Sequence, residues 1–363
     1  MEAEPVIPDE LRFAITRKCD GACRHCYNQS GKDIDRLSSD DFIDILKEVH
    51  TLNPKMDRIT LTGGEPLAEK DKVMKISRSA RSLGIRVRLV TRGWELDQEV
   101  CNELKESGVT RIQIGLDSSG ESGYEDDFQK AWDTFHSWLR SDQTGFSRTV
   151  DAINIAIRAG MDVSVRYSLC RTNLNDVIKT YQYVSSLGVS KFKFRVLFPD
   201  GRAKVRLRHE LISGEDMANA QFDLIQASKG NKTVVEITQP CLYAIPGRAN
   251  LLVGVNQSNA FKEACPCGTV AAYIDSNGDV KYCLFDEKIL GNVCNDSFLN
   301  IWNSVPAREA RKLRCPLDRS GSDCSSFKIL YTQFNDYLTF MSDYVKGVKE
   351  KNYRLNASII KTE

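Results

Sequence analysis

The sequence predicts an α/β protein whose central sheet is parallel. From residue 11 to about 198, a short β-branched run, a loop and a helical pattern alternate six times, as strands joined by helical crossovers do. The expected strands are residues 12–16, 58–62, 86–91, 111–116, 162–169 and 191–197. Six units are fewer than the eight of a closed (β/α)8 barrel, so an open doubly wound sheet and a partial barrel both fit.

The helices between these strands have recognisable ends. The stretch "SSDDFIDILKEVHTL" begins with Ser and Asp residues that cap helices, and "DKVMKISRSARSLGI" ends near a glycine that suits a helix C-terminus. The connection of about thirty residues after the fourth strand contains Trp and Phe residues, which predict an inserted helix at 118–147 that could cover the mouth of the sheet. Further helices are expected near 213–229 and from about 325.

The composition is that of an ordinary globular protein. The chain has 363 residues, and its 50 basic and 49 acidic side chains give no support for a nucleic-acid or anionic-membrane partner. No apolar run approaches the roughly 18 residues of a membrane span, and the first residues are acidic. We therefore expect a cytoplasmic protein without nucleic-acid or membrane partners. In that reducing compartment, the twelve cysteines are expected to be metal ligands or catalytic groups more often than disulfides.

Three cysteines follow the first expected strand in the motif "CDGACRHC". Cys19, Cys23 and Cys26 lie at the C-terminal end of that strand, where parallel α/β proteins bind their ligands. A structural zinc site prefers four protein ligands, and no fourth Cys or His follows at a typical distance, although His25 lies inside the motif. An iron-sulfur cluster held by three cysteines would leave one iron open for a small molecule. Three unliganded thiols so close together would be an oxidation hazard.

This cysteine motif and the "LTGGEPL" motif at the end of the second strand together resemble the radical S-adenosylmethionine (SAM) enzymes. The resemblance implies a partial (β/α)6 TIM-like barrel with a [4Fe-4S] cluster at its mouth. The cluster would be bound by the catalytic residues Cys19, Cys23 and Cys26, with SAM chelated at the open iron. Reductive cleavage of SAM would then give a 5'-deoxyadenosyl radical that abstracts hydrogen from a substrate.

The same resemblance assigns cofactor contacts. The GGEP motif would hold the methionine amino group through carbonyl and carboxylate acceptors, and its proline would stiffen the turn. The residues expected to bind the cofactor in this way are Gly63, Gly64, Glu65 and Pro66. Further contacts are expected at the ends of the fourth and fifth strands, from Asp117, Arg166 and Ser168.

Two positions depart from the family pattern. Arg92 stands in "VTRG" of the third strand, where relatives usually carry Asn. Gly115 stands in "IGLDSSG" of the fourth strand, where many relatives carry a Ser that contacts the ribose. The basic stretch "GRAKVRLRHE" after the last strand is expected to be a solvated loop, with contact to an acidic substrate as the alternative.

A second cysteine set predicts one auxiliary iron-sulfur cluster. The stretch "CPCGTVAAYIDSNGDVKYC" resembles the opening of the SPASM and twitch extensions of many radical enzymes, and "NGD" is typical of a hairpin turn with Gly278 at φ > 0. A second complete auxiliary cluster is not expected, because Asp318 and Lys328 stand where a full SPASM extension has cysteines. The candidate ligands are Cys265, Cys267, Cys283, Cys315 and Cys324, and zinc is the structural alternative.

The resemblance covers nearly the whole chain and divides it into parts. The expected parts are a radical SAM core at 8–235 with the insertion at 118–147, a small C-terminal cysteine-rich auxiliary-cluster domain of the SPASM or twitch type at 236–330, and a helical tail at 331–363.

The substrate stays open between a peptide and a small molecule. Enzymes with this hairpin and the "GNV" and "IWNS" segments most often modify peptides, so maturation of a ribosomally made peptide is the leading hypothesis. The alternatives are oxidation, epimerisation or dehydration of a sugar, aminocyclitol or nucleoside, and a non-catalytic iron-sulfur redox or binding protein. An electron donor such as flavodoxin or ferredoxin is an expected partner. Because the chain starts almost at its first strand, a separate protein would recognise a leader peptide.

Overall fold

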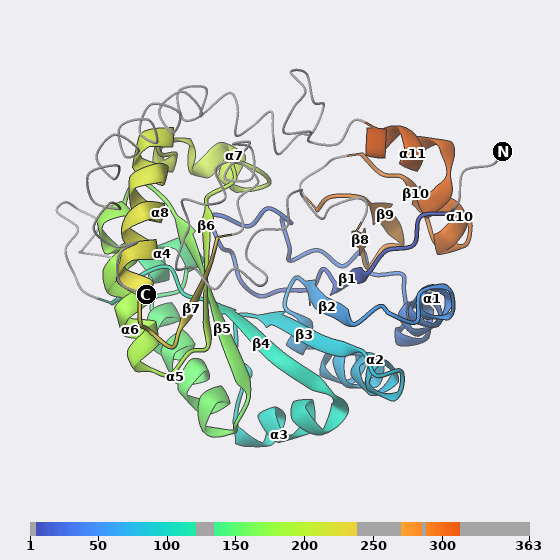
Figure 1. Ribbon diagram of the computed structural model, residues 1–363, viewed down its shortest axis with the longest axis horizontal. Coiled ribbons are helices and arrows are strands. Elements are labelled where there is room, and N and C mark those ends of the chain that lie inside the picture. The colour runs from blue at the N-terminus through green and yellow to red at the C-terminus, as the bar shows by residue number, and fades with distance from the viewer. Residues whose placement is uncertain (1–4, 121–133, 238–269, 285–287, 313–363) are drawn as a thin grey trace, which may run out of the picture.

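The computed structural model describes residues 5–120, 134–237, 270–284 and 288–312. Its strands form one sheet in the order β10-β9-β8-β1-β2-β3-β4-β5-β6-β7 (Figure 1). Neighbouring strands from β8 through β1 to β7 are parallel, whereas β8, β9 and β10 are joined in antiparallel pairs. The strands are β1 Glu10–Thr16, β2 Arg58–Gly63, β3 Arg86–Thr91, β4 Val109–Gly115, β5 Asp162–Leu169, β6 Lys191–Val196, β7 Val234–Ile237, β8 Ala271–Ile274, β9 Asp279–Lys281 and β10 Gly291–Asn292.

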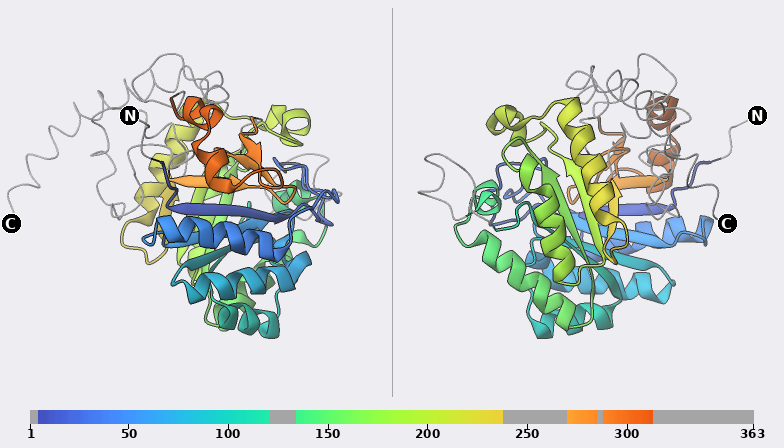
Figure 2. Two further views of the ribbon diagram at one scale, coloured as in Figure 1. Left: turned by 90° about the vertical axis from the view of Figure 1, so that its right-hand side faces the viewer. Right: turned by 60° about the vertical axis from the view of Figure 1, so that its left-hand side comes forward.

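Helices cover the outer face of the curved sheet, and the helices after β10 lie beside its β10 end (Figure 2). The α-helices are α1 Ser39–Leu52, α2 Lys70–Ser82, α3 Gln98–Ser107, α4 Phe135–Arg140, α5 Gly145–Arg158, α6 Val177–Ser186, α7 Ala203–Arg206, α8 Gly214–Ser228, α10 Phe298–Asn303 and α11 Val305–Lys312. Short 3-10 turns lie at η1 Pro66–Glu69, η3 Leu174–Asp176 and η4 Arg208–Glu210. Within the residues that the structure describes, none of these helices has the length and apolar character needed to cross a bilayer.

The two faces of the sheet differ in chemistry. On the outer face, Phe13 is fully buried and its ring lies 5.0 Å from that of Phe42 on α1. On the inner face, the buried Glu10 carboxylate accepts hydrogen bonds from Arg12, Arg58 and Arg88 at 3.0, 2.7 and 3.0 Å. Although burial alone would raise it, these guanidiniums hold the pKa of Glu10 well below its usual range. A doubly wound sheet would be apolar on both faces, so the charged inner face confirms the partial barrel.

All six predicted strands are present as β1 to β6, with ends within two residues of the prediction. Two further strands extend this parallel sheet, β7 beyond β6 and β8 beyond β1. The strand β7 has only four residues, too short a run to stand out in the sequence. The strand β8 belongs to the predicted hairpin, but its pairing with β1 was not predicted. The domain boundary predicted near residue 235 falls inside β7, and the boundaries of the three parts stay predictions.

The predicted helix ends agree with the structure. Ser38 caps α1 in a capping box with Asp41, and α2 ends just before Gly84, which has φ +73°. The predicted inserted helix is present as α4, and the helix expected near 213–229 is α8. The predicted helix from about 325 and the tail at 331–363 lie outside the described residues.

The predicted hairpin is formed by β8 and β9. Gly278 lies in its turn at φ +94°, as expected, and an added Cβ there would come within 2.5 Å of the Asn292 side chain. Because β8 pairs with β1 from Glu10↔Ala271 onwards, the hairpin extends the barrel sheet.

A buried ion pair joins this hairpin to the loop after β1. Arg17 donates from Nε to Asp275 Oδ1 at 2.8 Å and from a second nitrogen to the other carboxylate oxygen. The side chains are 16% and 1% exposed. Although burial alone would lower it, Asp275 raises the pKa of Arg17 above its usual range. Arg17 also donates to the Asn28 carbonyl at 2.5 Å, so the pair ties the hairpin to the cysteine loop.

Replacing Asp275 with Asn is expected to destabilise the fold by about 3 kcal/mol, because it leaves a buried guanidinium without its counter-charge. The measurement is the free energy of unfolding in urea, with the Arg86→Gln variant as the control. Arg86 pairs with Asp57, and both side chains are more than half exposed, so its loss should cost under about 1 kcal/mol. Equal stabilities of the two variants would show that the Arg17–Asp275 pair contributes no more than a surface pair.

Candidate functional site

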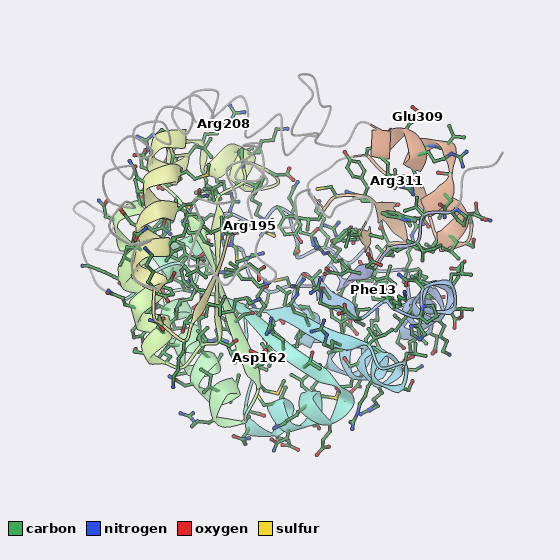
Figure 3. All side chains as sticks on the ribbon, viewed as in Figure 1. Phe13, Asp162, Arg195, Arg208, Glu309 and Arg311 are labelled. Carbon is green, nitrogen blue, oxygen red and sulfur yellow. The ribbon has the colours of Figure 1, made fainter. Side chains whose placement is uncertain are left out.

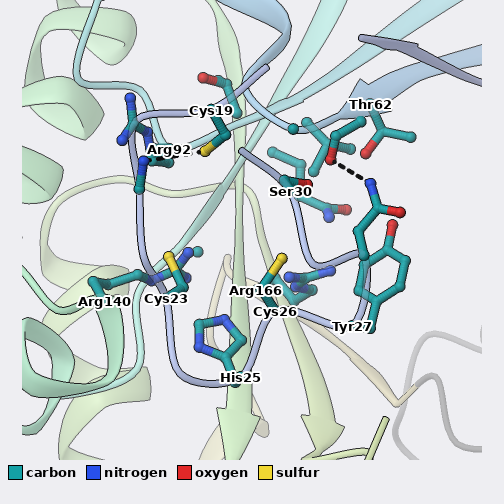
Figure 4. Close-up of a pocket in the computed structure, with 18 residues that line it drawn as sticks. Cys19, Cys23, His25, Cys26, Tyr27, Ser30, Thr62, Arg92, Arg140 and Arg166 are labelled. Atoms are coloured by element: carbon teal, nitrogen blue, oxygen red, sulfur yellow. Dashed lines mark hydrogen bonds between the residues drawn. The ribbon is translucent and has the colours of Figure 1, made fainter. Parts of the chain in front are cut away.

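The loop after β1 carries all three cysteines of the motif into a cavity at the C-terminal end of the sheet (Figure 4). Cys19, Cys23 and Cys26 line this cavity together with Gly63 and Gly64 from the end of β2. An added Cβ on Gly21 would lie 3.4 Å from the Cys19 sulfur and 3.6 Å from the Cys23 sulfur. These two sulfurs therefore approach the same point on the cavity wall.

The three thiols line the cavity without surrounding a single point. Among the described residues, no three His, Cys, Asp or Glu side chains are placed to share one metal ion. Thiolates that bind different irons of a [4Fe-4S] cluster need not converge so closely. Burial raises the pKa of Cys19 to about 11 and also raises that of Cys23, so forming the thiolates depends on the charge of the bound metal.

The GGEP turn packs directly on the cysteine loop. A Cβ added to Gly63, where φ is +139°, would lie 2.2 Å from the Thr16 carbonyl oxygen. A Cβ added to Gly64 would lie 2.1 Å from the Lys18 carbonyl oxygen. The Gly64 amide donates to the Thr16 carbonyl at 2.7 Å, and the Gly63 carbonyl accepts from Asn28 Nδ2 at 3.2 Å. Both positions require glycine because the two backbones touch.

The Glu65 carboxylate lies behind the cavity wall. It accepts hydrogen bonds from the Leu67 amide at 3.1 Å, the Thr91 hydroxyl at 2.5 Å and the Arg92 amide at 2.9 Å. Burial and the nearby Glu95 raise the pKa of Glu65, against the effect of these donors. Glu65 thus fixes the end of β3 against the GGEP turn, and neither it nor Pro66 is among the cavity-lining residues. Their contact with the cofactor stays a prediction.

Asp117 and Ser168 form a buried support for Arg140. The Asp117 carboxylate accepts from the Ser168 amide at 2.8 Å and from Arg140 Nη2 at 3.0 Å. Although burial alone would raise it, the Arg140 charge and a His136 contact lower the pKa of Asp117. Asp117 and Ser168 do not line the cavity, whereas Arg140 does. Sequence reasoning did not single out Arg140, because α4 reaches the cavity only through tertiary packing.

Of the three further cofactor contacts predicted at the ends of β4 and β5, Arg166 lines the cavity. In the described part of the chain, its guanidinium has no hydrogen bond or ion pair, and burial lowers its pKa, as does nearby Arg140. A carboxylate or hydroxyl of a bound molecule would satisfy its donors.

The arginines in β6 and in the segment after it separate into two groups, because Arg195 belongs to the strand itself. Arg206 and Arg208 are exposed, as expected, but they lie in the short helices α7 and η4 and not in a loop. Figure 3 shows Arg208 near the edge of the molecule. Arg195 lies near its middle in the same view, and burial lowers the pKa of Arg195 to about 10. The Arg202 backbone amide donates to the Cys26 carbonyl at 3.0 Å, so Arg202 supports the cysteine loop.

The auxiliary-cluster candidates are described only in part. Cys283 is buried just after β9, while Cys294 is exposed. The other four candidates lie outside the described residues, and they are Cys265, Cys267, Cys315 and Cys324.

Comparisons with known proteins agree with this site. A model of the radical SAM superfamily matches residues 13–184, and a model described as an iron-sulfur cluster-binding domain, SPASM, matches residues 265–325. The chain is 24% identical over 323 residues to an AdoMet-dependent heme synthase of Methanosarcina barkeri, covering 86% of this chain and 87% of that protein. It is 27% identical over 308 residues to the mycofactocin maturase MftC of Mycobacterium tuberculosis, covering 83% and 72%.

Solved structures share the fold. The structure of anSMEcpe with bound AdoMet and a Cp18Cys peptide superposes with a TM-score of 0.65 at 16% identity, covering 96% of this chain and 98% of that one.

Proposed function

Because this chain belongs to the radical SAM superfamily and carries a SPASM iron-sulfur cluster-binding domain, we propose that it is a peptide-modifying enzyme. The superfamily implies a [4Fe-4S] cluster, SAM and an auxiliary iron-sulfur cluster. When bound, the first cluster supplies the electron that cleaves SAM to the 5'-deoxyadenosyl radical, which abstracts hydrogen from the substrate. The observation that carries the radical chemistry is the single cavity lined by the cysteine triad, the GGEP glycines and Arg166.

Each part of this cavity has its own task in the proposal. Cys19, Cys23 and Cys26 hold the cluster, and Gly63 and Gly64 let the second strand approach the cysteine loop closely. The buried walls of the cavity keep solvent from the radical. Flavodoxin or ferredoxin would deliver the electron.

The peptide substrate is supported by relatives. MftC is named as a mycofactocin maturase, and anSMEcpe has been solved with a peptide. Cys283 would bind the auxiliary cluster together with ligands among the four cysteines outside the described residues. Such a cluster can accept an electron from a substrate radical.

Reduced protein with both clusters is expected to form 5'-deoxyadenosine from SAM, and to do so faster when its peptide is present. The test incubates the reconstituted, dithionite-reduced enzyme with peptides translated from short reading frames beside its gene. Mass spectrometry should then show 5'-deoxyadenosine and a peptide whose mass has changed. Unreduced enzyme is the control. Stimulation by a small-molecule extract, with every peptide unchanged in mass, would contradict the peptide proposal.

A further inference from the structure

Both departures from the family pattern lie beside the cysteine triad. At Gly115, an added Cβ would lie 2.1 Å from Arg140 Nη2, so the Arg140 guanidinium occupies the space that a serine side chain would fill. At the other departure, Arg92 Nη1 lies 3.2 Å from the position of an added Cβ on Gly21, near the Cys19 and Cys23 sulfurs. Figure 4 shows Arg92 beside Cys19 and Arg140 beside Cys23.

Both guanidiniums are buried and keep unused donors. Their side chains are 7% exposed for Arg92 and 9% exposed for Arg140. Arg92 Nη1 and Arg140 Nε have no hydrogen-bond partner in the described part of the chain, whereas Arg92 Nε lies 3.4 Å from Glu65 Oε2. A buried N–H without a partner costs free energy, so these donors favour a bound acceptor in the cavity.

Carboxylates fix the two guanidiniums in place. Arg140 pairs with Asp117 at 3.0 Å, and Arg92 pairs with Glu95 at 2.6 Å and with Asp20 at 2.5 Å.

Helix α4 is itself held on the cysteine loop, because the Leu139 carbonyl accepts from the Arg24 amide at 2.8 Å. The carbonyl of the preceding residue, Trp138, accepts from Arg24 Nε at 3.1 Å, and the Arg24 guanidinium lies over the Trp138 ring. The segment expected to cover the mouth therefore supports the loop and delivers Arg140 to Cys23.

We propose that Arg92 and Arg140 are outer-sphere donors to the radical cluster, one beside Cys19 and one beside Cys23, and that they raise its reduction potential. Reduction adds one electron to the cluster and changes no bond, so the cluster becomes more negative. Nearby positive charges stabilise the reduced state more than the oxidised state, and hydrogen bonds to the cluster sulfurs act in the same direction. The inference rests on the proposed cluster site and does not depend on the substrate.

The test is a redox titration of the reconstituted holoenzyme followed by electron paramagnetic resonance. The radical cluster is the one whose signal changes when SAM is added. In Arg140→Gln and Arg92→Gln, its reduced-to-oxidised ratio at a fixed potential should fall at least tenfold, a shift of about 59 mV to lower potential. Arg140→Lys keeps the charge and should shift less.

The matched control is Arg111→Gln. Arg111 lies on β4, like Gly115, but pairs with Asp162 at 2.7 Å at the other end of the strand. Its loss should leave the potential unchanged. If Arg140→Gln does not fold with a cluster, the Asp117→Asn/Arg140→Gln variant removes the pair without leaving a lone buried charge. It should show a smaller shift in the same direction, because the loss of the Asp117 charge acts against the loss of the Arg140 charge.

The inference would be overturned if the potential were unchanged in Arg92→Gln and also in Arg140→Gln or the double variant, provided that these proteins carry the iron content of the wild type. This holds even if 5'-deoxyadenosine forms. A shifted potential without 5'-deoxyadenosine in the wild type would instead overturn the proposed function.

Discussion

Replacing Cys23 with Ala should reduce 5'-deoxyadenosine formation to the level of a reaction without protein. Three thiols are proposed to hold the radical cluster, and the Cys23 sulfur lies with that of Cys19 beside Gly21. Two ligands would not keep the cluster in place with an open iron. The variant should retain about four of about eight iron atoms per chain, because the proposed auxiliary ligands are untouched. Chromatography of the reduced reaction mixture and iron analysis measure both results.

The control for this variant is Cys101→Ala. Cys101 is also buried, but it packs in α3 among apolar side chains, and the cavity-lining residues do not include it. Its loss should leave the iron content and SAM cleavage close to those of the wild type. Cleavage retained by Cys23→Ala would remove this cysteine from the cluster and overturn the assignment of the triad.

Local patterns predicted the first six strands, because each is a short β-branched run followed by a loop and a helical pattern. The pairing of β8 with β1 could not be predicted in this way, since it joins Glu10 to Ala271 across most of the chain. The charged inner face was also hidden, because Glu10 and its three arginines come from three different strands. Such contacts depend on how the sheet curves.

The site was predictable where function depends on spacing along the chain. The cysteine triad and the GGEP glycines are short motifs, and the structure brings them to one cavity. Arg140 could not be found by spacing, because it comes from an insertion whose position depends on the contact between Leu139 and Arg24. The signal that the sequence did offer for Arg140 was the glycine at position 115, where many relatives carry a serine. It marks space that another part of the chain fills.

Replacing Gly64 with Ala should weaken SAM binding about tenfold or more and destabilise the fold by about 1–3 kcal/mol. The added Cβ would overlap the Lys18 carbonyl oxygen at 2.1 Å, and that atom belongs to the backbone and cannot rotate away. The GGEP turn must therefore move from the cysteine loop, which strains the hydrogen bond from Glu65 N to Lys18 O, now 2.8 Å long. Equilibrium dialysis with SAM and urea unfolding measure the two effects.

The matched control, Gly84→Ala, separates binding from stability. Gly84 has φ +73° and open space around its Cβ position, so alanine there costs about 1 kcal/mol of backbone strain far from the cavity. This variant should lose stability and keep its SAM affinity. If Gly64→Ala also kept the wild-type affinity, the close approach of the two backbones would serve only the fold. A selective loss of affinity in Gly64→Ala would instead tie the GGEP turn to cofactor binding, because only that variant moves the Gly63 carbonyl at the cavity wall.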